Sequence, residues 1–159
     1  MNRYHAPGCP FCGHGTEETK FAESDNFMAI CNISPILPGH SLVIPKWHVH
    51  GLMHLSNSEL CEMNVFARNT MSVLVKAFAA DSFNWTIQDG EGAGQTVAHL
   101  HLHLIPRTAN DLPNPDDWNL RLRDSPLTAT TKGNRPILTS AQITDFLNRV
   151  RAAGRPVSN

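Results

Sequence analysis

The sequence predicts an α+β fold with an antiparallel sheet, and three observations carry that prediction. Several short apolar segments bounded by proline and glycine are typical of strands. Two longer segments begin with helix-capping residues and continue with apolar residues at helical intervals. Residues 99–105 alternate strictly between histidine and apolar residues, which is the pattern of a strand with one buried face. The length of 159 residues suits one domain, residues 1–159.

The first third of the chain is predicted to hold a loop and two strands. Residues 1–15 are rich in proline and glycine, which indicates a loop. Residues 27–31 are apolar throughout and predict a short buried strand. Residues 41–44 predict a second strand after a proline–glycine turn, and Pro45 is expected to end it.

The middle of the chain is predicted to hold a long helix and a third strand. Ser56 and Glu59 have the spacing of a capping box, and apolar residues then recur at helical intervals. A helix is therefore expected over residues 57–80. Residues 83–88 alternate weakly and predict a strand, which leads into a glycine-rich loop at residues 89–94.

The last part of the chain begins with the strand at residues 99–105, which the following proline is expected to end. Residues 107–138 contain several prolines and predict a long irregular segment. Thr139 and Gln142 form a second possible capping box, so a helix is expected over residues 140–152.

Composition and charge narrow the classes of function. The formal net charge is −1, so the chain has no overall field for gripping nucleic acid or a membrane surface. No apolar segment approaches the length that spans a bilayer, and the N-terminus lacks the apolar centre of a signal peptide. We therefore expect a cytoplasmic protein whose partners include neither nucleic acid nor a membrane. The unusual count is nine histidines in a chain of nearly zero net charge.

Three of these histidines, His99, His101 and His103, stand at alternate positions. On a strand their side chains would line one face at intervals of about 6.5–7 Å, while the leucines between them anchor the other face. A neutral imidazole in such a row can attack phosphorus or an acyl carbon, and its neighbours can donate hydrogen bonds to an anion. The row could also bind a metal ion or form the polar face of an amphipathic strand.

At these residues the sequence resembles the histidine triad superfamily, whose signature alternates histidine with apolar residues as residues 99–105 do. Residues 88–98, which run into the triad, resemble the fragile-histidine-triad branch, which contains diadenosine polyphosphate hydrolases. Residues 32–46 resemble the first nucleotide-binding segment of the same family. The resemblance covers about residues 9–107, and residues 108–159 do not contribute to it.

The resemblance implies hydrolysis or transfer at the α-phosphate of a nucleotide, through a covalent nucleotidyl-histidine. His101 would be the nucleophile, His103 would hydrogen-bond the α-phosphate oxygens, and His99 completes the triad. His40 would orient the surroundings of the nucleophile. Diadenosine polyphosphates or related nucleotides are the expected substrates. A nucleotide-binding protein without catalysis, a nucleotide phosphorylase and a phosphoramidase of the same fold are the alternatives.

The resemblance also assigns the nucleotide contacts and the architecture. Asn32 would bind the ribose hydroxyls, whereas Gln88, Gln95 and Thr96 would contact the phosphate chain or the leaving group. The family fold is an antiparallel sheet of about five strands with two helices, and it usually forms a homodimer through the long helix and the adjoining strand. The single domain is therefore expected to consist of a family core at about residues 9–107, an irregular segment at 108–138 and a C-terminal helix at 139–152.

Cys9 and Cys12 form a Cys-x-x-Cys turn, which is half of a zinc site. Spacing alone leaves the remaining ligands open, and the candidates include His14, His50 and His54. The resemblance to zinc-binding members of the superfamily implies a closed tetrahedral structural site with these four ligands: Cys9, Cys12, His48 and His99. Such a site would tie the N-terminal loop to the histidine strand.

Overall fold

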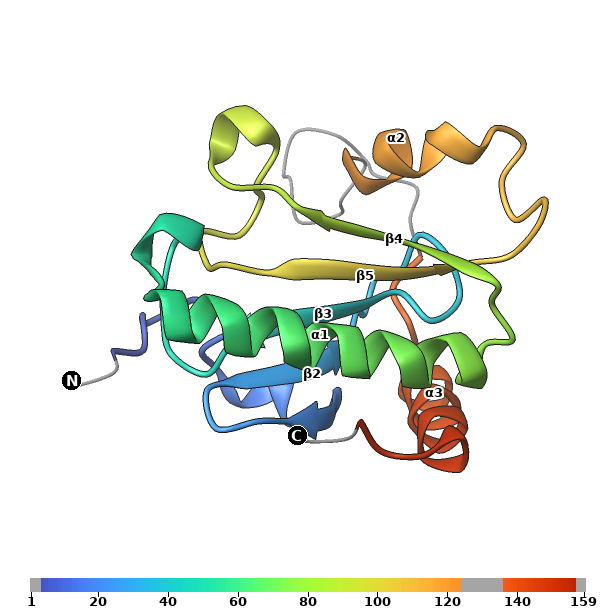
Figure 1. The fold of residues 1–159 in the computed structure, drawn as a ribbon, viewed down its shortest axis with the longest axis horizontal. Helices are drawn as coiled ribbons and strands as arrows, with labels where there is room; N and C mark the ends of the chain where they lie inside the picture. Colours follow the sequence, from blue (N-terminus) through green and yellow to red (C-terminus); the bar gives the residue numbers. More distant parts are fainter. Residues whose placement is uncertain (1–3, 124–135, 157–159) are drawn as a thin grey trace.

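The computed structural model describes residues 4–123 and 136–156. A single five-stranded antiparallel sheet forms its centre, with strand order β1-β2-β3-β5-β4 (Figure 1). The strands are β1 (Lys20–Glu23), β2 (Phe27–Cys31), β3 (Ser41–Pro45), β4 (Ser82–Ile87) and β5 (Leu102–Arg107). The predicted α+β class and the five-stranded sheet are confirmed.

Two longer helices begin where their capping boxes predict. Ser56 and Glu59 cap α1 (Asn57–Ala77), which ends three residues earlier than expected. Thr139 and Gln142 cap α3 (Ser140–Ala153) in the same way. The structure adds a third, short helix, α2 (Trp118–Arg123), inside the segment predicted to be irregular. Residues 124–135 of that segment lie outside the described residues.

Alternate residues of the central strands face opposite sides of the sheet. α1 lies across one face of the sheet (Figure 1). One set of residues joins its buried side chains in the main core, together with the leucines of the histidine segment: Phe27, Ala29, Cys31, Val43, Leu100, Leu102 and Leu104. The other set, Met28, Ile30, Leu42 and Ile44, packs against Phe11 of the N-terminal loop. Because Leu42 pairs with His103, that histidine lies on the second face.

The histidine segment does not form a strand over its whole predicted length. β5 begins at Leu102 rather than at residue 99, because Leu100 N–H donates to the Val49 carbonyl outside the sheet. The strand also continues through Pro106, which was expected to end it. Pro106 pairs with β4 only, beyond the last pairing with β3, so its missing N–H removes no hydrogen bond between β3 and β5.

The described residues contain no helix that is long and apolar enough to cross a membrane.

Gly39, in the turn before β3, has a φ of 84° and no room for a side chain. A Cβ there would lie 2.8 Å from Phe78 Cδ2 and 2.9 Å from Pro106 Cγ. We expect Gly39→Ala to lower the free energy of unfolding by about 2–4 kcal/mol, because a left-handed backbone and overpacking both oppose alanine. Urea unfolding measures this change.

Gly92→Ala is the matched control, because a Cβ at Gly92 would meet no atom within 4 Å and its φ is not positive. The control should unfold within about 0.5–1 kcal/mol of the parent. Equal stability of the two variants would contradict the steric account of Gly39.

Candidate active site and metal centre

The three histidines gather at the start of β5. His99 and His101 precede the strand and His103 lies within it, and all three are at least 95% buried. The ring centres of His101 and His103 lie 4.9 Å apart. Phe11 meets both His99 and His101, with ring centres 5.7 and 5.4 Å away. The imidazoles therefore share the face of the sheet opposite α1.

A backbone hydrogen bond fixes the tautomer of His101. Its Nδ1 lies 2.7 Å from the His99 carbonyl oxygen, which can only accept. Nδ1 therefore carries the proton, and Nε2 carries the lone pair of the neutral ring. Burial lowers the pKa of His101, so the ring is neutral at neutral pH. The arrangement presents a nucleophilic nitrogen without the help of a separate base.

His40 fixes the tautomer of His103 in a similar way. The Ile36 N–H donates to His40 Nδ1 over 3.2 Å, so His40 carries its proton on Nε2. That Nε2 lies 3.0 Å from His103 Nδ1. Nδ1 of neutral His103 is thus the acceptor, and its Nε2 carries an N–H that can serve as a donor.

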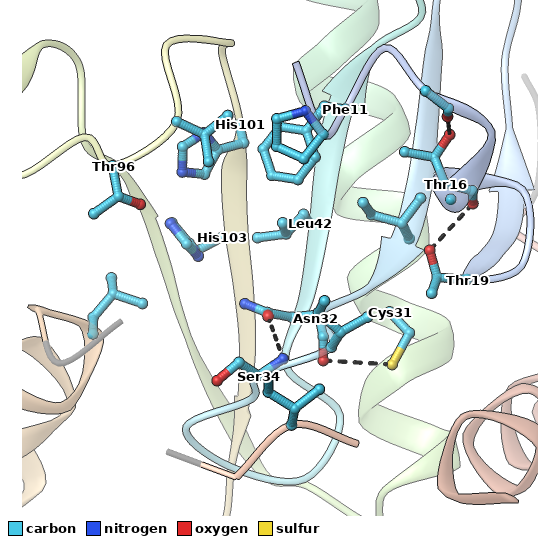
Figure 2. A pocket seen from close by; sticks show the side chains of 18 of the residues that line it. Phe11, Thr16, Thr19, Cys31, Asn32, Ser34, Leu42, Thr96, His101 and His103 are labelled. Carbon is cyan, nitrogen blue, oxygen red and sulfur yellow. Dashed lines mark hydrogen bonds between the residues drawn. The ribbon is translucent and has the colours of Figure 1, made fainter. Parts of the chain in front are cut away.

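A cavity of about 480 Å³ opens beside these rings (Figure 2). Its volume lies within the range of small-molecule sites. Phe11, Ile30 and Leu42 form an apolar wall, and His101 and His103 line the same cavity. An apolar wall beside imidazole groups suits a ligand that combines a flat ring with an anionic group.

Three of the four predicted polar contacts, Asn32, Gln88 and Thr96, line this cavity. Asn32 is held by its side-chain oxygen, which accepts from Ser34 N–H over 2.9 Å. Gln95 lies outside the lining and instead supports the glycine-rich loop. Its Oε1 accepts from Gly90 N–H over 2.7 Å, and its Nε2 donates to the backbone of residue 50.

The structure also adds cavity residues that the sequence did not single out: Phe11, Thr16, Thr19, Ser34, Leu122 and Ile137. Leu122 and Ile137 come from the C-terminal segment, which no motif connects with the histidines. Phe11 lies inside the Cys-x-x-Cys turn, and this position was the one available signal of its place beside the triad.

The four proposed metal ligands lie close together, and the ring of one of them, His99, contacts Phe11. One ligand atom from each of Cys9, Cys12, His48 and His99 lies within 4.8 Å of the others. His99 Nδ1 lies 3.4 Å from Cys9 Sγ and 3.5 Å from Cys12 Sγ. Cys12 Sγ also lies 3.5 Å from His48 Nδ1. A tetrahedron of zinc–sulfur and zinc–nitrogen bonds has edges of about 3.5 Å, so these contacts fit zinc.

The protonation states of the cluster suit a cation. His99 Nε2 lies 3.2 Å from the Pro45 carbonyl and carries the proton, which leaves the Nδ1 lone pair facing the sulfur atoms. Burial lowers the pKa of His99 to about 4 and also lowers the pKa of His48, so both rings are neutral. Burial raises the pKa of the Cys12 thiol, so a cation beside this sulfur would favour its thiolate form.

The alternative ligands are placed differently. His50 and His54 are exposed, and neither belongs to the four-residue cluster among the described side chains. The His50 ring centre lies 5.0 Å from that of His48 and 6.5 Å from that of His54. The side chain of His14 lies outside the described part of the chain.

The chain is similar in sequence to a known protein family and to two characterised enzymes. A family profile described as HIT domain matches residues 15–110. The bis(5'-nucleosyl)-tetraphosphatase [asymmetrical] of Schizosaccharomyces pombe is 47% identical over 88 residues, which are 55% of this chain and 48% of the relative. The bis(5'-adenosyl)-triphosphatase of Dictyostelium discoideum is 40% identical over 96 residues, 60% of this chain and 64% of the relative. The matches thus span less than two thirds of either relative.

Two solved structures extend the likeness to most of the chain. A hypothetical histidine triad nucleotide-binding protein from Sulfolobus tokodaii has a TM-score of 0.72 at 25% identity, with 91% of each chain covered. A Zn-bound histidine triad family protein from Mycobacterium smegmatis has a TM-score of 0.64 at 25% identity, covering 92% of this chain and 97% of its own.

Proposed function

This chain belongs to the HIT domain family, and from that membership and the geometry of the cavity we propose that it is a nucleotide hydrolase or nucleotidyl transferase. Its substrates are diadenosine polyphosphates or related nucleotides. The names of two relatives, a bis(5'-nucleosyl)-tetraphosphatase and a bis(5'-adenosyl)-triphosphatase, support this substrate class. The observation that carries the proposal is the state of His101, which is buried and neutral. Its Nδ1 donates to the His99 carbonyl, so the lone pair of the ring lies on Nε2.

The proposed reaction has two displacements at the α-phosphorus. His101 Nε2 forms a bond to phosphorus while the bond to the bridging oxygen breaks, and the leaving nucleotide departs with that electron pair. Water or another acceptor then attacks the phosphorus and loses its proton to solvent, while the phosphorus–Nε2 bond breaks and its electron pair returns to Nε2 of the neutral ring. His103 donates from Nε2 to an α-phosphate oxygen, which stabilises the charge that develops there. His40 is a positioning residue, because it acts through His103.

The remaining cavity residues hold the nucleotide. Asn32 contacts the ribose hydroxyls, and Gln88 and Thr96, which line the cavity, contact the phosphate chain or the leaving group. Gln95 supports the glycine-rich loop through its hydrogen bond with Gly90 N–H. Its contact with the phosphate chain of the nucleotide therefore depends on the position of that loop.

Product analysis of diadenosine tetraphosphate tests the proposal. In water that carries a heavy oxygen isotope, the label is expected in adenosine monophosphate and not in the leaving nucleotide, because water attacks the α-phosphorus bound to His101. Label in the leaving nucleotide would contradict attack at that atom. A rate that requires added phosphate would indicate phosphorolysis, and tight binding without products would indicate a binding protein.

Zinc is the metal that we propose for the Cys9, Cys12, His48 and His99 cluster. Two thiolates and two neutral imidazoles give a closed tetrahedral set, which is typical of structural zinc. The Zn-bound relative from Mycobacterium smegmatis supports the same assignment. When bound, the ion would cross-link the N-terminal loop to the segment that carries the nucleophile.

We further propose a cytoplasmic homodimer. The four cysteines are free, which suits a reducing compartment. In the described part of the chain, β4 is an edge strand, and Phe83 on it is 51% exposed. Val65 on α1 is 41% exposed, so a partner that covers the edge strand and the long helix would bury both side chains.

A further inference from the structure

The Cys-x-x-Cys turn contributes to two sites at once. Its two cysteines belong to the metal cluster, whereas the two residues between them, Pro10 and Phe11, form part of the cavity wall. Its neighbours add to the same wall, and the cavity residues that come from the loop are Pro10, Phe11, Gly13, Gly15 and Thr16. One end of the cavity is therefore built on a segment whose anchors are metal ligands.

Phe11 is the aromatic side chain that the loop contributes to the cavity. Its ring packs against the apolar cluster that includes Ile30 and Leu42. Figure 2 shows Phe11 beside His101 and across the cavity from Asn32. A flat aromatic base in the cavity would pack against the Phe11 ring, while its phosphate would lie near His101 and His103.

Few other interactions hold the loop in this place. The backbone bonds of Cys9 and Cys12 are local, from Cys9 N–H to the Ala6 carbonyl and from Cys12 N–H to the Cys9 carbonyl. In the described residues, two backbone hydrogen bonds join residues 4–16 to the rest of the fold: His48 N–H donates to the Tyr4 carbonyl over 2.8 Å, and Thr19 N–H donates to the Thr16 carbonyl over 3.3 Å. Further attachments include the sulfur–imidazole contacts of the metal cluster, the packing of Phe11, the Thr19 hydroxyl bond to the Thr16 carbonyl and the edge-on contact between the Tyr4 and His48 rings.

We propose that metal binding and nucleotide binding are thermodynamically coupled through Phe11. The bound metal fixes the loop, and the loop holds Phe11 as the wall against which the base packs. The metal-loaded protein consequently binds a nucleotide more tightly than the metal-free protein. By linkage, the nucleotide raises the affinity for the metal by the same factor. This inference rests on the proposed function, because it takes a nucleotide as the ligand and zinc as the metal.

Two equilibrium measurements on the full chain test the coupling. The dissociation constant of adenosine monophosphate is measured by calorimetry for zinc-loaded and chelator-stripped protein, with circular dichroism as the check on folding. The zinc affinity is measured by chelator competition with and without the nucleotide. We expect both affinities to change by the same factor of about ten or more. Equal nucleotide affinities of the loaded and stripped protein would overturn the coupling.

Phe11→Ala removes the aromatic side chain from the cavity wall and keeps all four proposed metal ligands. The zinc-loaded variant is expected to keep its zinc stoichiometry and to bind adenosine monophosphate about tenfold more weakly, because a base–aromatic contact is lost. Stripping its zinc should then change nucleotide affinity little. Unchanged nucleotide affinity in this variant would overturn the proposal even if the stripped parent protein unfolds.

Phe21→Ala is the matched control. Phe21 is half-buried and packs against Phe146 of α3, with ring centres 5.4 Å apart, and it does not line the cavity. The control should retain both the nucleotide affinity and its dependence on zinc. The same loss of coupling in both variants would show a general effect of packing and would overturn the role of Phe11.

Ribose 5-phosphate separates this inference from the proposed function. It has the sugar and phosphate but no base, so its affinity should depend neither on zinc nor on Phe11. Zinc-loaded protein that binds neither probe would overturn the nucleotide function and the coupling together. Protein that binds both probes, each independently of zinc, would overturn the coupling alone. Protein that binds no zinc would overturn the coupling and the zinc assignment but not the nucleotide function.

Discussion

His101→Asn is expected to lower turnover of diadenosine tetraphosphate by at least about 10⁴-fold, the scale of losing a covalent nucleophile. Nucleotide affinity should stay within about threefold, because the asparagine amide can still donate to the His99 carbonyl that now accepts from His101 Nδ1. The variant thus keeps a hydrogen-bonded side chain but lacks the attacking lone pair. Single-turnover kinetics and calorimetry with adenosine monophosphate measure the two effects.

His54→Asn carries the same substitution at an exposed position outside the cavity lining. It should retain the turnover of the parent. Substantial turnover by His101→Asn would exclude this residue as the nucleophile, whereas equal losses of turnover and affinity would indicate a role in binding alone.

The second large effect is expected from the paired substitution Cys9→Ser and Cys12→Ser. Metal analysis should fall from about one zinc per chain to none, because serine is a poor ligand for zinc compared with a thiolate. The unfolding midpoint should fall by about 10 °C or more. Bound zinc is expected to stabilise the fold by about 4 kcal/mol, and each kcal/mol lost lowers the midpoint of a domain of this size by about 2–4 °C. Thermal unfolding followed by circular dichroism measures the shift.

Cys61→Ser is the control, because Cys61 is exposed on α1 and lies outside the cluster. This variant should keep both its zinc and its midpoint. Full zinc occupancy after loss of Cys9 and Cys12 would exclude the assigned ligands and direct the search to other histidines.

Local signals in the sequence predicted the two longer helices, α1 and α3, well. Ser56 and Thr139 each accept from the backbone N–H three residues later, so the information that starts α1 and α3 is contained within one turn. β1 was not predicted, because its four residues lack a strong alternating pattern and are held by pairing with β2. The early start predicted for β5 failed because Leu100 bonds to Val49, a contact that the local pattern cannot show.

The sequence predicted those parts of the candidate site whose residues lie close together in the chain. The alternation of His101 and His103 indicated a shared face, and the structure places their rings 4.9 Å apart. The tautomers depend on partners such as Ile36 N–H and the Pro45 carbonyl, which only the folded chain brings to the rings. The place of Phe11 in the cavity likewise depends on packing between distant segments.

The acceptor that fixes the His101 tautomer belongs to the main chain of residue 99 and not to its imidazole. Every amino acid at this position supplies the same carbonyl. Sequence drift or deliberate redesign at residue 99 could therefore discard the metal ligand while preserving the identity of the attacking nitrogen. Residue 99 thus serves the metal site through its imidazole and the nucleophile through its carbonyl oxygen. Because the two roles belong to different atoms, they can evolve separately.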